Sequence, residues 1–191
     1  LDDYPSTSMD YYDDTRRTSF EASVLGCANL SESQLSSLKT SSEVTNTPTH
    51  YVVLDRTLFY PEGGGQLGDQ GSLGDVLVCD TRVENGTIYH LTDGSVPIGE
   101  VSGTVSWDRR RQLMDHHTAV HIVGGSARAL LGPHIWQAGS NKGARYARID
   151  LTHFSRLSRD EINRIEDYSN DVIASDATVE KLEMTRAEAD E

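Results

Sequence analysis

The chain has 191 residues and a formal net charge of −13, long enough for one large domain or two small ones with a buried core. Hydrophobic residues make up 36% and charged residues 25% of it, and no apolar run reaches 18 residues, which excludes a transmembrane segment. The N-terminal stretch is acidic and polar, unlike a signal peptide, and the two cysteines lack disulfide-framework or short metal-binding spacing. These features predict a cytoplasmic protein without a membrane partner. The first residue, Leu1, indicates a piece excised from a longer chain.

Charge is distributed unevenly along the sequence. Residues 1–50, 51–106 and 160–191 carry net charges of −5, −6 and −8, whereas residues 107–159 carry +6. Such a basic block is typical of a phosphate-binding face, although a solvated basic helix face gives the same pattern. Aspartate outnumbers glutamate 18 to 12 and arginine outnumbers lysine 14 to 3, a composition typical of halophilic proteins.

Short strands with glycine-rich turns are predicted over residues 1–106, a pattern typical of a small barrel or sandwich. An Asn-Gly pair at Asn85 marks a hairpin turn between two of them. A helical turn is expected near Ser33–Lys39. The predicted strands are Thr18–Ala28, Tyr51–Leu54, Leu73–Val83, Thr87–Leu91 and Val101–Trp107.

Helices dominate the prediction for residues 107–191. The first runs from an N-cap at Asp108 to Leu131, where Gly132-Pro133 ends it. Capping boxes at Ser158 and Thr185 open two more helices, and the chain ends inside the second. Strands are expected at Ile135–Gly139, Arg145–Leu151 and Val179–Met184, and the core-facing residues of the middle helix are Ile162, Ile165, Val172 and Ile173. The predicted fold class is α+β, a small N-terminal β-barrel followed by a two-layer α/β unit that continues past Glu191.

Two histidines, His117 and His121, stand four residues apart on the first predicted helix, so both imidazoles project from one face. That spacing lets them share one tetrahedral metal ion, usually zinc, although such pairs also arise often by chance. Thr118 occupies the position at which zinc proteases of the His-Glu-x-x-His type carry glutamate, which excludes that class.

Five glycines fall within the nine residues from Gly63 to Gly71. They let the backbone approach a ligand closely and form turns with positive φ, or simply turn a tight barrel corner. The run matches neither a phosphate-binding loop nor a dinucleotide fingerprint. A third feature is Gln137, twenty residues after His117, whose side chain either orients a water or carbonyl near the metal or lies unused on the surface.

Taken together, the three features resemble the editing domain of alanyl-tRNA synthetases, most of all in its archaeal form, and the freestanding editing proteins of the same superfamily. The similarity runs in the family's order over nearly the whole chain. Its strings are Phe59–Asp69, His116–His121 and Trp136–Ser140, extended by Asp55–Tyr60, Arg110–Met114, Asp150–His153 and Thr185–Ala189.

The resemblance implies a role for each motif. His117 and His121 correspond to half of a zinc site whose Cys-x-x-x-His half is expected beyond Glu191, so this chain is predicted to bind Zn²⁺ weakly or not at all. Gln137 corresponds to a glutamine tied to deacylation. The glycine motif that lines the editing pocket corresponds to Gly63, Gly64 and Gly65. The candidates for contacting the hydroxyl of a misactivated serine are Thr118, Gln137 and Gln66.

The implied function is hydrolysis of Ser-tRNA(Ala) and Gly-tRNA(Ala), errors that a small synthetic pocket cannot fully avoid. Residues 1–106 would form the barrel-like subdomain with the glycine motif, and residues 107–191 the two-layer α/β editing core. Whether zinc activates water or anchors the terminal adenosine stays open. The implied partners are the acceptor end of tRNA(Ala) and the rest of a synthetase chain. The expected phosphate contacts are Arg109, Arg110, Arg111, Arg128, Lys142, Arg145 and Arg148.

Three alternatives remain at this point. The chain could be a freestanding deacylase, although the Leu1 start and the acidic lead-in favour a piece of a synthetase. Without its second pair of metal ligands, it could be a non-catalytic tRNA-binding module. A generic metal-dependent hydrolase would need its own four-ligand set, which the sequence lacks.

Overall fold

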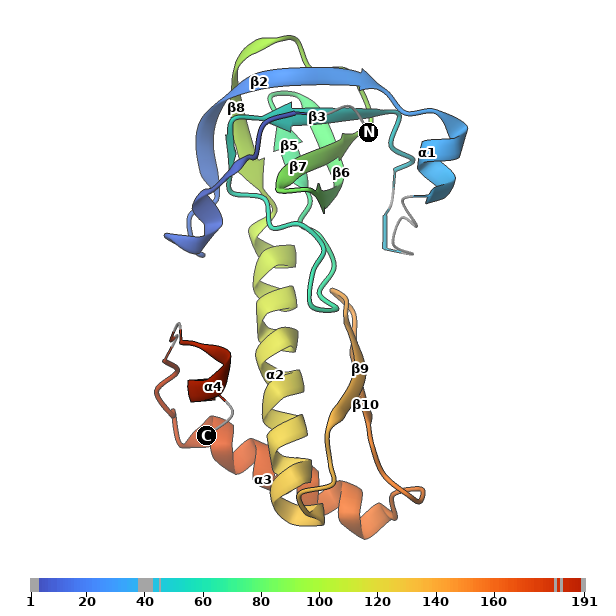
Figure 1. The fold of residues 1–191 in the computed structure, drawn as a ribbon, viewed down its shortest axis with the longest axis vertical. Coiled ribbons are helices and arrows are strands. Elements are labelled where there is room, and N and C mark those ends of the chain that lie inside the picture. The colour runs from blue at the N-terminus through green and yellow to red at the C-terminus, as the bar shows by residue number, and fades with distance from the viewer. Residues whose placement is uncertain (1–3, 38–42, 45, 181, 183, 190–191) are drawn as a thin grey trace. The chain divides into compact units, whose positions relative to one another are not determined.

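The computed structural model describes residues 4–37, 43–44, 46–180, 182 and 184–189. The chain forms two compact units (Figure 1). One comprises residues 1–120 and 137–151, and the other comprises residues 121–136 and 152–191. The long helix α2 (Trp107–Leu131) belongs to both.

Six strands of the first unit form an antiparallel sheet that closes into a barrel in the order β2-β3-β7-β6-β5-β8 (Figure 1). Closure comes from β8, which pairs with both β2 and β5, so each of the six strands has two neighbours. The strands are β2 (Ser19–Asn29), β3 (His50–Leu54), β5 (Gly71–Leu73), β6 (Val76–Glu84), β7 (Thr87–Thr92) and β8 (Gly99–Val105). Together with the helices they confirm the α+β class.

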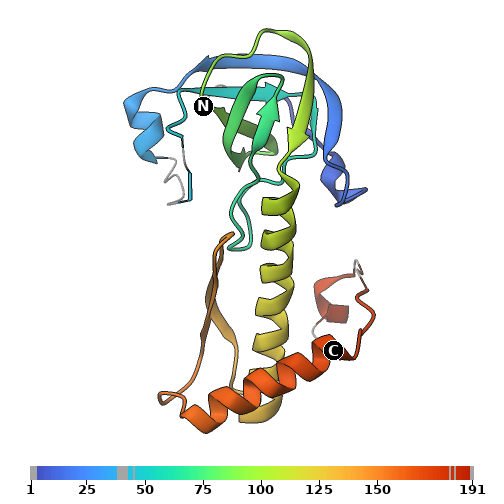
Figure 2. The same cartoon turned by 180° about the vertical axis from the view of Figure 1, so that it is seen from behind.

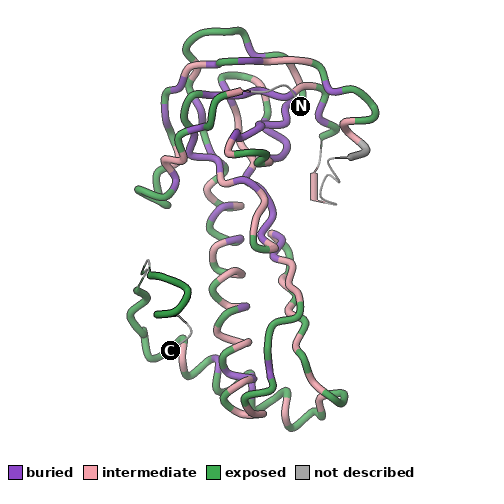
Figure 3. The backbone as a smooth tube through the Cα atoms, viewed as in Figure 1, coloured by how far each residue is buried: buried purple, intermediate pink, exposed green. Residues whose placement is uncertain are grey.

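Strand β3 shows how the sequence builds the barrel core. Because successive side chains of a strand point to opposite faces, Val52 and Leu54 join one apolar cluster while Tyr51 and Val53 join another. All four are buried, and Figure 3 shows buried residues concentrated in the barrel strands. The predicted strand at residues 51–54 therefore contributes side chains to two hydrophobic clusters, one on each face of the sheet.

Two turns match the sequence prediction closely. Asn85 and Gly86 link β6 to β7 with φ of 50° and 83°. Positive φ at both central residues is the requirement of a type I′ hairpin turn, which matches the right-handed twist of the flanking strands. Gly132, with φ of 117°, follows the last residue of α2. The start of α2 differs by one residue, since it begins at Trp107 and Asp108 lies inside its first turn.

The N-terminal segment is more ordered than the sequence predicted. Strand β1 (Ser8–Met9) pairs in parallel with β4 (Arg56–Thr57), and the short 3₁₀ helix η1 (Asp10–Tyr12) follows it. The helical turn expected near residue 33 is α1 (Glu32–Ser37), and Lys39 lies outside the described residues.

A β-hairpin completes the first unit: β9 (Gln137–Lys142) pairs antiparallel with β10 (Ala147–Leu151). Its first strand begins two residues later than predicted because the N–H of Ile135 bonds back to the Gly132 carbonyl in a turn. In Figures 1 and 2 the loop between β4 and β5 lies beside α2 and reaches one end of this hairpin.

In the second unit, α3 (Arg159–Ala174) starts with the predicted capping box, in which Ser158 and Glu161 bond reciprocally. The short helix α4 (Arg186–Ala189) has the same arrangement between Thr185 and Glu188. The predicted core face of α3 is only partly correct. Ile165 is buried, but Ile162 and Ile173 are exposed.

No strand forms among the described residues of the range 179–184, so that prediction is wrong for this part of the chain. A strand needs a pairing partner for its backbone groups, and the described residues of this range form no such pairing. Within the described residues, no helix is both long enough and apolar enough to cross a bilayer.

A buried histidine makes the barrel sensitive to acid. His90 on β7 is fully buried, with Nδ1 3.0 Å from the Val52 carbonyl and Nε2 2.8 Å from the Thr57 hydroxyl. Burial lowers the pKa of His90 to about 4, although the bond to Val52 opposes this shift. The neutral ring therefore donates from Nδ1 to Val52 and accepts the Thr57 proton at Nε2.

We expect the free energy of unfolding to fall as pH drops from about 6.5 towards 4. In this range His90 is protonated in the unfolded chain but stays neutral in the folded protein. The histidine contributes about 1.4 kcal/mol per pH unit, or about 3 kcal/mol over this window. Urea unfolding of wild type and His90→Gln between pH 4.5 and 7.5 measures it. The variant should show a shallower acid slope, and parallel slopes would contradict this role.

Candidate functional site

The glycine run contains a tight turn whose shape only glycine suits. Gly63 and Gln66 exchange both backbone hydrogen bonds, at 3.0 and 2.9 Å, which leaves Gly64 and Gly65 as the two central residues. Their φ values are 57° and 78°, as a type I′ turn requires. At Gly65 a Cβ atom would also lie 2.6 Å from the Ser140 carbonyl oxygen. The glycine run therefore forms a tight turn, which was one of the two roles that the sequence allowed for it.

This second constraint separates the two glycines. We expect Gly64→Ala to cost about 1–2 kcal/mol, because its Cβ adds left-handed strain but only an ordinary contact 3.7 Å from the His117 ring. Gly65→Ala should cost about 1–3 kcal/mol more, because the Ser140 backbone must move. Chemical unfolding of both variants tests the difference. Equal losses of unfolding free energy in the two variants would show that the Ser140 backbone moves aside at little cost.

One lysine ties this turn to the hairpin. The backbone N–H of Lys142 donates to Gly65 at 2.7 Å, and its carbonyl accepts the Leu67 N–H at 3.1 Å. Its ammonium Nζ donates to the Gly64 carbonyl and to Ser140 Oγ, both at 2.7 Å. The side chain is only 1% exposed. Lys142 thus fixes the glycine turn against β9, which also carries Gln137.

The turn in turn positions Gln66 against the helix. Gln66 is buried, and its Oε1 lies 2.8 Å from Nδ1 of His117 on α2. Both side chains line a pocket of about 230 Å³. Two residues that the sequence placed in separate motifs therefore meet in one site. The complete lining is Tyr11, Tyr12, Thr15, Tyr60, Gln66, Arg110, Met114 and His117.

Three tyrosines that sequence reasoning missed form much of the pocket wall. The ring of Tyr11 packs against Tyr60 at 5.3 Å and Tyr12 at 4.6 Å between centroids. Burial raises the pKa of Tyr11 and of Tyr60 above the usual range, so both phenols stay neutral. At about 230 Å³ the pocket falls below the 300–1,000 Å³ typical of sites for drug-sized ligands, and it suits a smaller group. The sequence signals were the Tyr11-Tyr12 pair in a segment with no predicted structure and the place of Tyr60 inside the Phe59–Asp69 motif.

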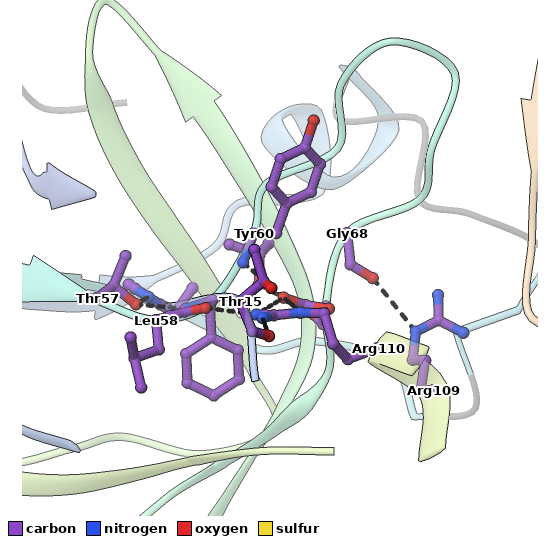
Figure 4. A network of polar contacts seen from close by, with 11 residues as sticks. Thr15, Thr57, Leu58, Tyr60, Gly68, Arg109 and Arg110 are labelled. Atoms are coloured by element: carbon purple, nitrogen blue, oxygen red, sulfur yellow. Dashed lines mark hydrogen bonds and ion pairs between the residues drawn. The ribbon is translucent and has the colours of Figure 1, made fainter. Parts of the chain in front are cut away.

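A buried ion pair supports the floor of the site (Figure 4). Asp69 is fully buried, accepts Nε of Arg110 at 2.8 and 3.0 Å, and accepts the Tyr60 N–H at 2.6 Å. Arg110 also donates to the Thr15 carbonyl at 3.0 Å and to the Leu58 carbonyl at 2.5 Å. Burial raises the pKa of Asp69, and the guanidinium opposes this shift.

Residues 3–109 match the family model described as tRNA synthetases class II (A). The chain belongs to this family. It is 41% identical over 193 residues to the alanine–tRNA ligase of Natronomonas pharaonis, covering 98% of this chain and 19% of that protein. Identity to the alanine–tRNA ligase of Methanopyrus kandleri is 38% over 195 residues, with coverage of 99% and 20%. Identity to the alanine–tRNA ligase of Halorubrum lacusprofundi is 41% over 195 residues, which cover 100% of this chain and 19% of that protein.

The relationship to alanyl-tRNA synthetases that the three motifs predict is therefore confirmed. The chain spans about a fifth of the length of these relatives.

The basic residues predicted to contact phosphates divide into buried and exposed groups. Arg110 is 3% exposed and Lys142 1%, and both point their donors at protein carbonyls or side chains. Their burial does not fit the phosphate contacts expected from the sequence. Arg111 and Arg145 are exposed and remain candidates for such contacts.

Arg109 has an intermediate environment. Its Nε donates to the Gly68 carbonyl at 3.2 Å (Figure 4), and Nη1 pairs with Glu43 at 3.0 Å. Burial would raise the pKa of Glu43, yet hydrogen bonds from the Ala144 N–H and Arg109 lower it. Arg109 and Arg145 line a second pocket of about 420 Å³ beside this carboxylate. The charge of Arg109 is thus already balanced within the fold.

The other predicted contacts lie elsewhere. Gln137 is exposed on β9, where its Nε2 donates to Ser140 Oγ at 3.1 Å. Thr118 is exposed on α2. Among the described residues, neither lines the pocket that holds Gln66 and His117.

The histidine pair fits a metal site in part. The contact between His117 Nδ1 and the Gln66 oxygen favours the tautomer with its lone pair on Nε2, as in histidines that bind zinc through that atom. His121 follows four residues later on α2. In the part of the chain that the structure describes, no three His, Cys, Asp or Glu side chains gather as a metal site. His117 and His121 are the residues of this chain that would hold a zinc ion.

Proposed function

We propose that this chain carries the editing site of an alanyl-tRNA synthetase and hydrolyses the ester bond of Ser-tRNA(Ala) and Gly-tRNA(Ala). The observation that carries the proposal is the 2.8 Å contact between Gln66 and His117 inside a small tyrosine-walled pocket. Lys142 connects the glycine turn beside that contact to the strand of Gln137. The glycine-rich motif and the histidine motif therefore meet at this pocket, and the strand that carries Gln137 is bonded to the glycine turn.

The pocket suits a short amino acid with or without a hydroxyl. Its aromatic wall accepts only a small group, whereas the Gln66 and His117 edge offers polar partners. A serine hydroxyl can hydrogen-bond at this polar edge, whereas the methyl of alanine brings no hydrogen-bonding group to it. Glycine enters by size alone. This difference would let the site reject the correct product, Ala-tRNA(Ala).

The remaining roles rest on the same proposal. Gln137 orients the attacking water or the ester through the β9 side of the site. Zinc, where a complete ligand set is present, supplies Lewis-acid or anchoring chemistry at His117 and His121. The exposed Arg111 and Arg145 meet the acceptor-stem phosphates of tRNA(Ala), and the barrel-like part, residues 1–106, presents the glycine motif to the editing core, residues 107–191. The rest of a synthetase chain supplies aminoacylation.

The proposal is tested by comparing two substrates with the full-length protein. Ser-tRNA(Ala) should be hydrolysed well above the spontaneous rate, and Ala-tRNA(Ala) should stay close to the spontaneous rate. Repeating the two hydrolysis measurements over a series of potassium chloride concentrations tests whether the protein is adapted to high salt, as its composition predicts. If neither ester is hydrolysed faster than its spontaneous rate, the chain would instead be a non-catalytic tRNA-binding module.

A further inference from the structure

Ser140 on β9 has an unusual hydrogen-bonding environment. Its Oγ accepts from the ammonium of Lys142 at 2.7 Å and from the amide Nε2 of Gln137 at 3.1 Å. A serine hydroxyl has two acceptor lone pairs and one proton. Since both lone pairs are occupied, the O–H can act only as a donor. Among the described residues no acceptor takes that proton.

The cation behind Ser140 is itself unusual. Lys142 is 1% exposed, and no carboxylate in the described part of the chain forms an ion pair with it. Its ammonium is held by oxygens of Gly64 and Ser140. Burial lowers the pKa of Lys142, which reflects the cost of this placement. A methionine would fill the same space without that cost, so the charge calls for a role beyond packing.

Ser140 also lies directly against the turn that shapes the pocket. A Cβ atom on Gly65 would come within 2.8 Å of Ser140 Oγ, so only glycine leaves the hydroxyl its place. The next residue along the turn, Gln66, contacts His117 in the pocket. Ser140 therefore packs against the residue that directly precedes Gln66 in the turn.

We propose that Ser140 is a catalytic hydrogen-bond donor to the carbonyl oxygen of the aminoacyl ester, and that Lys142 is a positioning residue that acts through it. The inference rests on the proposed function. A donor fixed in advance and polarised by a neighbouring cation stabilises the negative charge that develops on that oxygen. A role of Ser140 as nucleophile is disfavoured, because the ammonium and the amide occupy the lone pairs that attack would need.

The reaction balances without a covalent enzyme intermediate. A water oxygen adds to the ester carbon, and the C=O π electrons move to the carbonyl oxygen, where the Ser140 O–H hydrogen-bonds the oxyanion. The oxyanion then re-forms the double bond, and the bond to the ribose oxygen breaks. The ribose oxygen leaves with that electron pair and takes up the proton lost by the water. Ser140 keeps its own proton throughout.

The test uses a double-mutant cycle in the full-length protein, with kcat and KM for steady-state hydrolysis of Ser-tRNA(Ala) as the readout. Ser140→Ala should slow the reaction about 10²-fold while KM changes less than about twofold. Lys142→Met should slow it about 10-fold or more. Lys142→Met should cause a smaller loss in the Ser140→Ala background than in wild type, because the part of its effect that passes through the hydroxyl is already gone, whereas the bond to the Gly64 carbonyl is lost in both backgrounds. Ser102→Ala, a serine of β8 bonded to Glu21, is the control and should match wild type.

A wild-type rate for Ser140→Ala would overturn the proposal. A full additional loss from Lys142→Met in the Ser140→Ala background would also overturn it, since the lysine would then act by holding the turn. If Lys142→Met does not fold, Gln137→Ala removes the other donor to Ser140 Oγ from an exposed position. A smaller loss in the Ser140→Ala background than in wild type would support the proposal, and equal losses in the two backgrounds would overturn it. Absence of hydrolysis in the wild type would instead refute the proposed function, and the inference with it.

Discussion

Arg110→Met should lower the free energy of unfolding by about 3–5 kcal/mol, because it leaves the buried carboxylate of Asp69 without its cation. The same guanidinium bonds the Leu58 and Thr15 carbonyls, which also lose a donor. Asp69→Asn should be costly for the reciprocal reason. Equilibrium unfolding in urea measures both losses.

A matched control lies next to Arg110 in the sequence. Arg111 is 69% exposed and pairs with the exposed Asp115 at 3.7 Å, so Arg111→Met should change stability by less than about 1 kcal/mol. The double variant Asp69→Leu, Arg110→Met should lose less than the sum of the single losses, because no buried charge remains uncompensated. Similar losses for Arg110→Met and Arg111→Met would contradict the assignment of Arg110 to the fold.

Gln66→Ala and His117→Ala should each slow hydrolysis of Ser-tRNA(Ala) by the full-length protein about 10²-fold or more. Each change removes one partner of the 2.8 Å contact at the polar edge of the pocket. Because Gln66 and His117 act as a pair, the double variant should be little slower than the slower single variant. Single-turnover rates at saturating enzyme measure the effect.

Gln112→Ala provides the control on the same helix. Gln112 is an exposed glutamine whose amide contacts His116 at 3.0 Å, four residues along α2. Its rate should stay within about twofold of wild type, since it does not line the pocket. Equal losses for Gln112→Ala and Gln66→Ala would show that the effect comes from general damage to the helix.

Local sequence signals predicted much of the fold because their physics is local. The Asn85-Gly86 turn, the end of α2 at Gly132 and the capping box at Ser158 each depend on a few neighbouring residues. Predictions that depend on distant partners did less well. Ile162 on α3 follows the expected apolar spacing, yet it is exposed, because burial depends on which element packs against the helix.

The candidate site shows the same division. Sequence motifs identified Gln66 and His117, but their contact joins residues 51 positions apart and needed the fold. Tyr11 and Tyr12 of the pocket wall came from a segment with no recognisable motif, and Tyr60 lies inside a motif without having been singled out, because aromatic side chains carry no signal of their own until they pack together. Charge counting placed Arg110 and Lys142 on a phosphate face, since a sequence gives the sign of a charge but not its burial.

The most direct test of the central claim is whether the pocket prevents serine from accumulating on tRNA(Ala). The full-length protein and its Gln66→Ala variant are incubated with tRNA(Ala), ATP and either alanine or serine, and charged tRNA is followed over time. The proposal predicts equal charging with alanine, and accumulation of Ser-tRNA(Ala) by the variant alone. Absence of Ser-tRNA(Ala) with the variant, despite normal charging with alanine, would contradict an editing role for this pocket.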